Sequence, residues 1–313
     1  MNGYTGRFFN DDVTKLSSSG GAATAFAKAF IERGGVVLGV CYSDDFEFAQ
    51  YYLVKKVEEL KFIIGTKYLL PKTYIKNIGM DLFSWLKQNN LPILIFGLGC
   101  LISCIKQHCL TNKISLEKIY FIELICHGAT HNKVQKDYVA FLQKKHKSRI
   151  IDFNIRYKKR SWKPFYLKAV FENGKVYTKP FYYTRYGCGF SNLSLNSCYS
   201  CKFKGENHPG NIIIGDCWSE SVSDFPAGLS LILALDKKGD ELIKFLDTND
   251  FLLEKRDLST LLLNNPMFFK SRNETNSKNS FLQNLYGLSL KKAVIKEKGI
   301  LKYIIQKALR KID

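Results

Sequence analysis

Residues 91–100 read Leu-Pro-Ile-Leu-Ile-Phe-Gly-Leu-Gly-Cys, an apolar run followed by a glycine-rich loop that ends in a thiol. A continuous apolar run without alternation is typical of a strand in a sheet that is covered on both faces. Residues 101–110 follow with a helical pattern, so the segment predicts a buried strand, a short loop and a helix. Cys100 would then lie at the N-terminus of the helix, where the helix dipole favours thiolate.

The same order of elements recurs on either side of this segment. Residues 35–42 predict a buried strand, and residues 118–125 predict another that ends in Cys126-His127-Gly128, with a helix over 132–145. Alternation of strands and helices predicts an α/β lobe, in which ligands gather at the carboxyl ends of the strands. Cys100 and Cys126 both follow such ends.

From residue 150 the pattern changes to short β runs, over 150–157, 165–171 and 176–181. The expected fold is therefore α/β: a mixed-sheet lobe with flanking helices, a β-rich insertion and a C-terminal helical tail. A length of 313 residues fits this organisation. We expect an N-terminal α/β lobe over residues 1–145, a β-rich lobe over 146–250 and a basic helical tail over 251–313.

A pair of closely spaced cysteines is the clearest chemical signal in the chain. The segment Ser197-Cys198-Tyr199-Ser200-Cys201-Lys202-Phe203 is followed by Gly215-Asp216-Cys217-Trp218. Two cysteines separated by two residues can hold one metal centre from a single turn. With Cys100 and Cys126 they would supply four thiolates from three segments, which suit either zinc or an iron-sulfur cluster.

Two other segments have compositions that make them candidate functional segments. Ser17-Ser18-Ser19-Gly20-Gly21 precedes a helical pattern, and a helix N-terminus with open N–H groups suits an anion. Gly65-Thr66-Lys67-Tyr68 combines flexibility, a hydroxyl, a cation and an aromatic ring. An ordinary capped helix and an ordinary surface loop are the alternatives for these two segments.

The overall composition narrows the class of protein. The formal net charge is +19, which fits an anionic partner or simply a lysine-rich proteome, and no nucleic-acid-binding motif accompanies the charge. The first residues have no apolar signal region, so we expect a cytoplasmic protein whose nine cysteines are thiols or ligands. Residues 288–309 alternate apolar residues with Lys and Arg, which is typical of a helix at a membrane surface or a partner, or of a solvated helix.

Taken together, these motifs resemble the coenzyme F420-reducing hydrogenase/dehydrogenase beta-subunit family, in order and approximate spacing over residues 17–240. The resemblance implies a flavin-binding, iron-sulfur oxidoreductase, and the family includes members associated with bacterial surface-polysaccharide synthesis. Two segments differ from the usual family pattern, namely Leu98-Gly99-Cys100-Leu101 and the run over residues 211–219. The Cys-rich ferredoxin module that many relatives carry is absent from the sequence, so the electron donor would be a separate ferredoxin-like protein.

The resemblance also implies roles for individual residues. It makes Cys100, Cys126, Cys198 and Cys201 the ligands of a 4Fe-4S cluster. It places FAD against Ser17, Ser18, Ser19, Gly20, Gly21, Gly65, Thr66, Lys67, Tyr68, Asp216 and Trp218. Lys67 and His127 are the expected catalytic residues, acting on a small substrate. The alternative function is a zinc-binding, non-catalytic scaffold protein of a polysaccharide-synthesis system, and a nucleic-acid-binding role is not expected.

Overall fold

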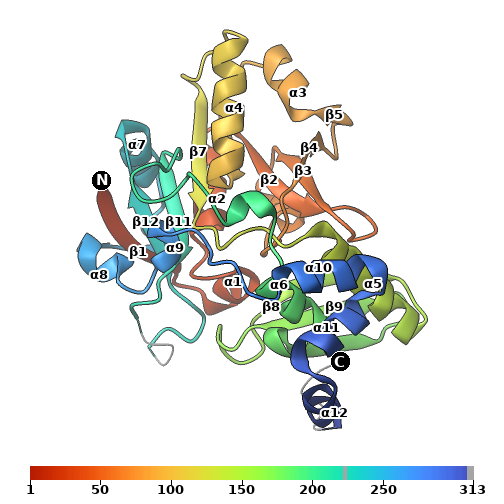
Figure 1. The fold of residues 1–313 in the computed structure, drawn as a ribbon. Helices are drawn as coiled ribbons and strands as arrows, with labels where there is room; N and C mark the ends of the chain where they lie inside the picture. The colour runs from red at the N-terminus through yellow and green to blue at the C-terminus, as the bar shows by residue number, and fades with distance from the viewer. Residues whose placement is uncertain (221–223, 309–313) are drawn as a thin grey trace.

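The computed structural model describes residues 1–220 and 224–308, and its main feature is a ten-stranded mixed sheet (Figure 1). In sheet order, its strands are β13 (Phe251–Arg256), β1 (Asn2–Phe8), β12 (Ser230–Ala234), β11 (Ile212–Asp216), β7 (Ile119–Leu124), β6 (Ile93–Gly97), β2 (Val36–Tyr42), β3 (Ala49–Val54), β4 (Lys72–Ile75) and β5 (Met80–Asp81).

The four central strands, β11, β7, β6 and β2, run parallel to one another. Parallel strands end at the same edge of a sheet, and a crevice beyond their carboxyl ends is the usual place for a ligand in such folds. Cys100, in the first turn of the helix that follows β6, and Cys126, in the loop that follows β7, both lie at this edge. The expectation that both thiols follow strand ends is therefore confirmed.

Helices cover both faces of the central strands. On one face, α2 (Ala22–Glu32), α7 (Lys237–Phe245) and the short helix η1 (Val57–Phe62) pack against Leu94 and Phe96. On the other face, α3 (Leu82–Gln88) and α4 (Gly99–Thr111) pack against Ile93 and Ile95. Successive residues of β6 thus enter opposite cores, which explains why this segment is apolar without alternation.

A second body of structure surrounds a three-stranded antiparallel sheet of β8 (Ile150–Tyr157), β9 (Tyr166–Phe171) and β10 (Val176–Pro180). Its core is shared with α5 (Asn132–His146), α6 (Arg185–Asn192), α10 (Lys278–Gly287), α11 (Leu290–Lys298) and α12 (Ile300–Ala308). Figure 1 shows these helices beside the small sheet, away from β1 and β12. The predicted β insertion and C-terminal helices are therefore both present, within an α/β fold.

The large sheet takes strands from all three of the expected segments 1–145, 146–250 and 251–313. The last segment begins with β13 and continues through α8 (Leu258–Leu262) and α9 (Pro266–Phe269). Its later helices contribute Phe281 and Val294 to a buried core. The segment therefore packs on the body of the protein, unlike the expected tail. Residues 309–313 lie outside the described chain. Within the described residues, no helix has the length and apolar character needed to cross a bilayer.

Candidate functional site

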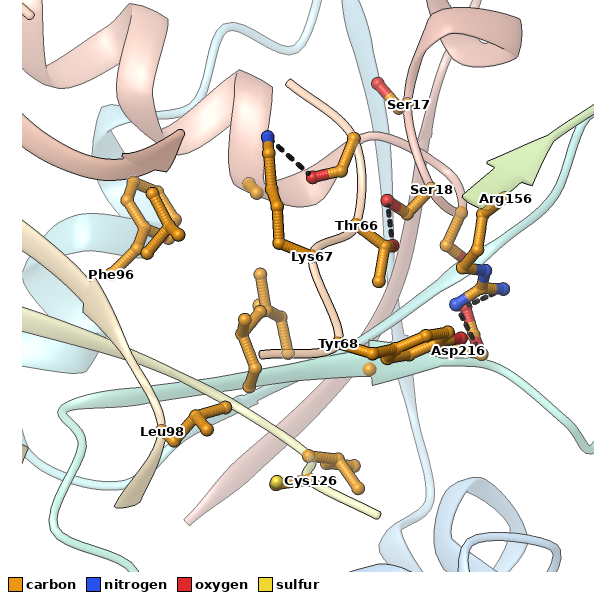
Figure 2. A pocket seen from close by; sticks show the side chains of 18 of the residues that line it. Ser17, Ser18, Thr66, Lys67, Tyr68, Phe96, Leu98, Cys126, Arg156 and Asp216 are labelled. Carbon is orange, nitrogen blue, oxygen red and sulfur yellow. Dashed lines mark hydrogen bonds and ion pairs between the residues drawn. The ribbon is translucent and has the colours of Figure 1, made fainter. Parts of the chain in front are cut away.

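A cavity of about 390 Å³ lies at the carboxyl edge of the parallel strands (Figure 2). The ends of β6, β7 and β11 form part of its wall, and the segments before α2 and after η1 form much of the rest. Of the residues predicted from the sequence, it is lined by Ser17, Ser18, Ser19, Gly21, Gly65, Thr66, Lys67, Tyr68, Cys126, His127, Asp216 and Trp218. Segments far apart in the sequence therefore meet around one space.

The expected phosphate site is the N-terminus of α2. Gly21 occupies its N-cap in the left-handed region, with φ 96°, and supplies no side-chain cap. The first turn of a helix leaves N–H groups without intrahelical acceptors, and its dipole favours an anion. Beside it, the Thr66 hydroxyl donates to the Ser18 hydroxyl over 2.6 Å, as Figure 2 shows. This end of the cavity has the donors that a phosphate group needs.

Two residues of the Ser-rich segment have structural roles as well. The Ser19 hydroxyl donates to the carbonyl of Leu229 over 2.7 Å and is buried. Gly20 is not among the lining residues of the cavity; a Cβ there would lie 2.2 Å from the Gly6 carbonyl oxygen. Glycine is therefore required at position 20 for the close approach to β1, and contact of Gly20 with FAD stays a prediction.

Lys67 lines the same cavity, and its ammonium group is bound by the preceding segment of the chain. Its Nζ donates to the carbonyls of Ile63, Ile64 and Gly65 over 2.8 to 3.2 Å. Burial lowers the pKa of Lys67 to about 8. The lysine thus holds a positive charge at neutral pH, in a position fixed by backbone carbonyls.

Tyr68 and His127 form part of an aromatic wall of the cavity. The rings of both pack on Phe190, Tyr68 with centroids 4.6 Å apart and His127 stacked at 5.3 Å. Burial raises the pKa of Tyr68 to about 12. Burial, with Arg272 and Lys204 nearby, lowers the pKa of His127 to about 4, so its ring is neutral at pH 7.

Electrostatic interactions link the four predicted cysteine ligands, which come from three segments. Cys126 is the thiol that lines the cavity, and its Sγ accepts a hydrogen bond from the N–H of Gly128 over 3.2 Å. Burial raises the pKa of Cys126 to about 12, and charge on Cys198 and Cys100 adds to the effect. Burial also raises the pKa of Cys100, to which Cys198 and Cys201 contribute. The four thiols are therefore close enough for charge on one to act on another.

The spacing of the four thiols bears on whether they could hold a single ion. Over residues 1–220 and 224–308, no three His, Cys, Asp or Glu side chains are gathered closely enough to hold one metal ion. A cubane binds one thiolate at each of four irons, so its ligands are spaced more widely than those of zinc. A cationic centre of either kind would relieve the mutual repulsion of four thiolates.

A buried ion pair, Arg156 with Asp216, lies beside Tyr68 in the wall of the cavity (Figure 2). The guanidinium binds both carboxylate oxygens, over 2.9 and 3.1 Å, and lies 4.1 Å from the centroid of the Phe165 ring. Burial opposes the charge on Arg156, but Asp216, Tyr68 and Tyr182 together outweigh burial, and the pKa of Arg156 is raised. Asp216 was predicted from its motif, whereas the contribution of Arg156 from β8 was not.

Lys158, two residues further along the chain from Arg156, joins the helix α1 (Asp11–Leu16) to two loops near the phosphate end. Its Nζ donates to the carbonyls of Thr14, Ser19 and Ala227, over 2.6 to 2.7 Å. Burial, with Arg156 nearby, lowers the pKa of Lys158 to about 7. The residue therefore holds the Ser-rich segment in place from the small sheet.

The lowered pKa of Lys158 predicts that the free energy of unfolding depends on pH. An unfolded lysine titrates near 10.4, so between about pH 7 and pH 10 the unfolded chain keeps a proton that the folded chain has released. The free energy of unfolding should then rise with pH, by up to about 1.4 kcal/mol per pH unit from this residue. Urea unfolding of the natural chain and of Lys158→Met across this range should show a steeper rise in the natural chain. Parallel curves would contradict the prediction.

A buried Glu123–His208 pair and Lys204 lie near the thiols, and neither was predicted from the sequence. Glu123 of β7 accepts from the ring of His208 over 2.7 Å, with both side chains 2% exposed, and also from the N–H of Gly210. Lys204 donates to the carbonyl of Cys126 over 2.7 Å. Lys204 lies three residues after the Cys-x-x-Cys motif, which could have drawn attention to it. Glu123 and His208 are 85 positions apart, so no local pattern indicates that they pair.

Comparison with known proteins gives two findings. A family model that describes the carboxy-terminal region of the coenzyme F420 hydrogenase/dehydrogenase beta subunit matches residues 92–257. The fold is similar to a chain of the F420-reducing [NiFe] hydrogenase complex from Methanosarcina barkeri, with TM-score 0.57 and 16% identity, covering 96% of this chain and 93% of that one. No curated protein matches the chain.

Proposed function

The chain belongs to the coenzyme F420 hydrogenase/dehydrogenase beta-subunit family, which indicates an oxidoreductase role, and on this premise we propose that it is a flavin-dependent iron-sulfur oxidoreductase. The observation that carries the proposal is that one cavity joins the open N-terminus of α2 to Cys126. A dinucleotide with its phosphates at α2 and its ring toward Cys126 would lie next to a cluster held by Cys100, Cys126, Cys198 and Cys201.

The chain's own residues have separable tasks in this proposal. The cluster would pass single electrons and FAD would supply two-electron hydride chemistry. The α2 N-terminus, Ser18 and Thr66 bind the phosphates, and the fixed charge of Lys67 stabilises negative charge on a reduced ring. Neutral His127 faces the cavity near Cys126 and orients the bound ring or substrate. Catalytic roles for Lys67 and His127 remain proposals.

The positions of the thiols suggest the side on which an electron donor docks. Cys100 is exposed whereas Cys126 is only partly exposed and lines the cavity, so the proposed ligand set extends from the surface toward the cavity. We propose that a separate ferredoxin-like protein docks over Cys100 and delivers electrons inward to a small substrate. The cytoplasmic location and the link to polysaccharide synthesis stay predictions.

The test is the absorption spectrum, metal content and flavin content of the chain purified without oxygen, with two variants of Ala23. The natural chain should be yellow-brown, with iron, sulfide and FAD. Ala23 lines the cavity in the first turn of α2. Ala23→Glu places a negative charge beside the proposed phosphate site, which should weaken FAD binding roughly tenfold or more, whereas an acidic residue in a first turn does not harm the helix itself.

Ala23→Ser is the matched neutral control and should bind FAD like the natural chain. Position 23 is a better choice than Gly21, because a Cβ at Gly21 would lie 2.6 Å from the Phe8 ring and would disturb the fold directly. Equal FAD affinity in all three chains would remove the phosphates from α2. A colourless natural chain that contains only zinc would support the scaffold alternative and end the oxidoreductase proposal.

A further inference from the structure

The helix α12 presents an apolar face that the described chain does not cover. Ile300, Leu301, Ile304 and Ile305 are 68%, 72%, 55% and 49% exposed. On the other side of the helix, Tyr303 is 4% exposed and belongs to the core around the small sheet. Figure 1 shows α12 projecting from the body near the end of the chain. The helix is therefore anchored by Tyr303 while its aliphatic face points outward.

Positive charge borders this face. Residues 288–308 contain six lysines and one acidic residue, Glu297. Lys296, Lys302 and Lys307 are exposed on α11 and α12. Glu297 accepts a hydrogen bond from the Ser277 hydroxyl over 2.9 Å, so the one carboxylate of this segment is engaged with α10. An aliphatic strip between exposed lysines is complementary to a surface that is anionic outside and apolar beneath.

We propose that the outer face of α12 binds the surface of an anionic lipid membrane. The four aliphatic side chains would enter the boundary between headgroups and acyl chains, and the lysines would contact lipid phosphates. A helix of nine residues is only about 14 Å long, and such a face is small against the roughly 800 Å² per partner of a standard protein interface. Size and charge therefore favour a lipid surface over a protein partner, and this proposal is independent of the proposed chemistry.

The test uses the full chain and vesicle flotation. Binding should be strong to vesicles of equal parts phosphatidylcholine and phosphatidylglycerol, weak to phosphatidylcholine alone, and reduced by salt. Leu301→Glu should lower binding by about tenfold or more, because a charge replaces an exposed apolar side chain at the centre of the face. Leu110→Glu is the matched control, since Leu110 is 64% exposed at the far end of α4, and it should bind like the natural chain.

Four results would overturn the proposal: no binding to anionic vesicles, equal binding to both kinds of vesicle, equal loss in both variants, or unchanged binding in Leu301→Glu. A natural chain that sediments as a dimer, with Leu301→Glu monomeric and vesicle binding absent, would make the face a protein interface. Near-ultraviolet circular dichroism should match in all chains, since every substituted side chain is exposed.

Discussion

Cys201→Ser, purified without oxygen, should lose most of the iron and acid-labile sulfide of the natural chain. Each iron of a cubane takes one thiolate, and serine offers a harder oxygen donor that such centres accept poorly. Loss of an outer-shell partner costs roughly 10- to 100-fold in metal affinity, so loss of a direct ligand should cost more. Electron transfer from an external donor should fall with the iron content. FAD should remain bound, because α2 lies at the other end of the cavity.

Cys104→Ser is the matched control for this variant. Cys104 lies on α4 one turn beyond Cys100, and both are exposed. A serine there removes one thiol without touching the proposed ligand set, so iron content should not change. Equal iron in the Cys201→Ser and natural chains would show that Cys201 is no ligand, and equal loss in both variants would point to general instability.

Asp216→Ala should lower the free energy of unfolding by about 3–5 kcal/mol, which is the usual cost of leaving the partner of a buried ion pair uncompensated. Arg156 and Asp216 have side chains only 8% and 11% exposed, and the guanidinium binds both carboxylate oxygens. Removal of the carboxylate leaves the cation of Arg156 between Phe165 and the cavity. Urea unfolding measures the loss.

A double variant separates the structural role of this pair from a binding role. Arg156→Met with Asp216→Leu replaces both charges by apolar side chains of similar size, which often restores the stability lost by a single change. Because both residues line the cavity, we expect stability to recover while FAD binding stays weakened. Recovery of both quantities would show that the pair only supports the fold.

Much of the fold was visible in residues 91–126. The unbroken apolar run of β6 predicted a sheet covered on both faces, and in the structure helices cover both, because successive side chains of a strand point to opposite sides. The positions of Cys100 and Cys126 after neighbouring strands predicted that they meet at one edge, and parallel pairing of β6 and β7 brings them there. The local sequence pattern was sufficient to predict these features because each depends on residues close together in the chain.

The strand β1 shows where local pattern was insufficient. Its sequence, Asn-Gly-Tyr-Thr-Gly-Arg-Phe, has two glycines and little apolar character, and no strand was predicted there, yet it lies between β12 and β13. A Cβ at Gly6 would lie 2.4 Å from the Phe251 ring, and one at Gly3 would lie 2.7 Å from Leu258. The large side chains that fill this space belong to residues 245 and 255 positions away, so the strand signal was not local.

By itself, the sequence determined the α/β class, the order of strands and helices from β6 to β10, and the candidate thiols, because each depends on residues close together in the chain. Only the tertiary structure decided that the large sheet includes residues from both ends of the chain, and that Arg156 meets Asp216 across 60 positions. It also decided that Cys126 and the α2 N-terminus share one cavity. These features depend on which side chains become neighbours in space. The parallel pairing of the central strands and the contacts between the small sheet and the rest of the chain determine those neighbours.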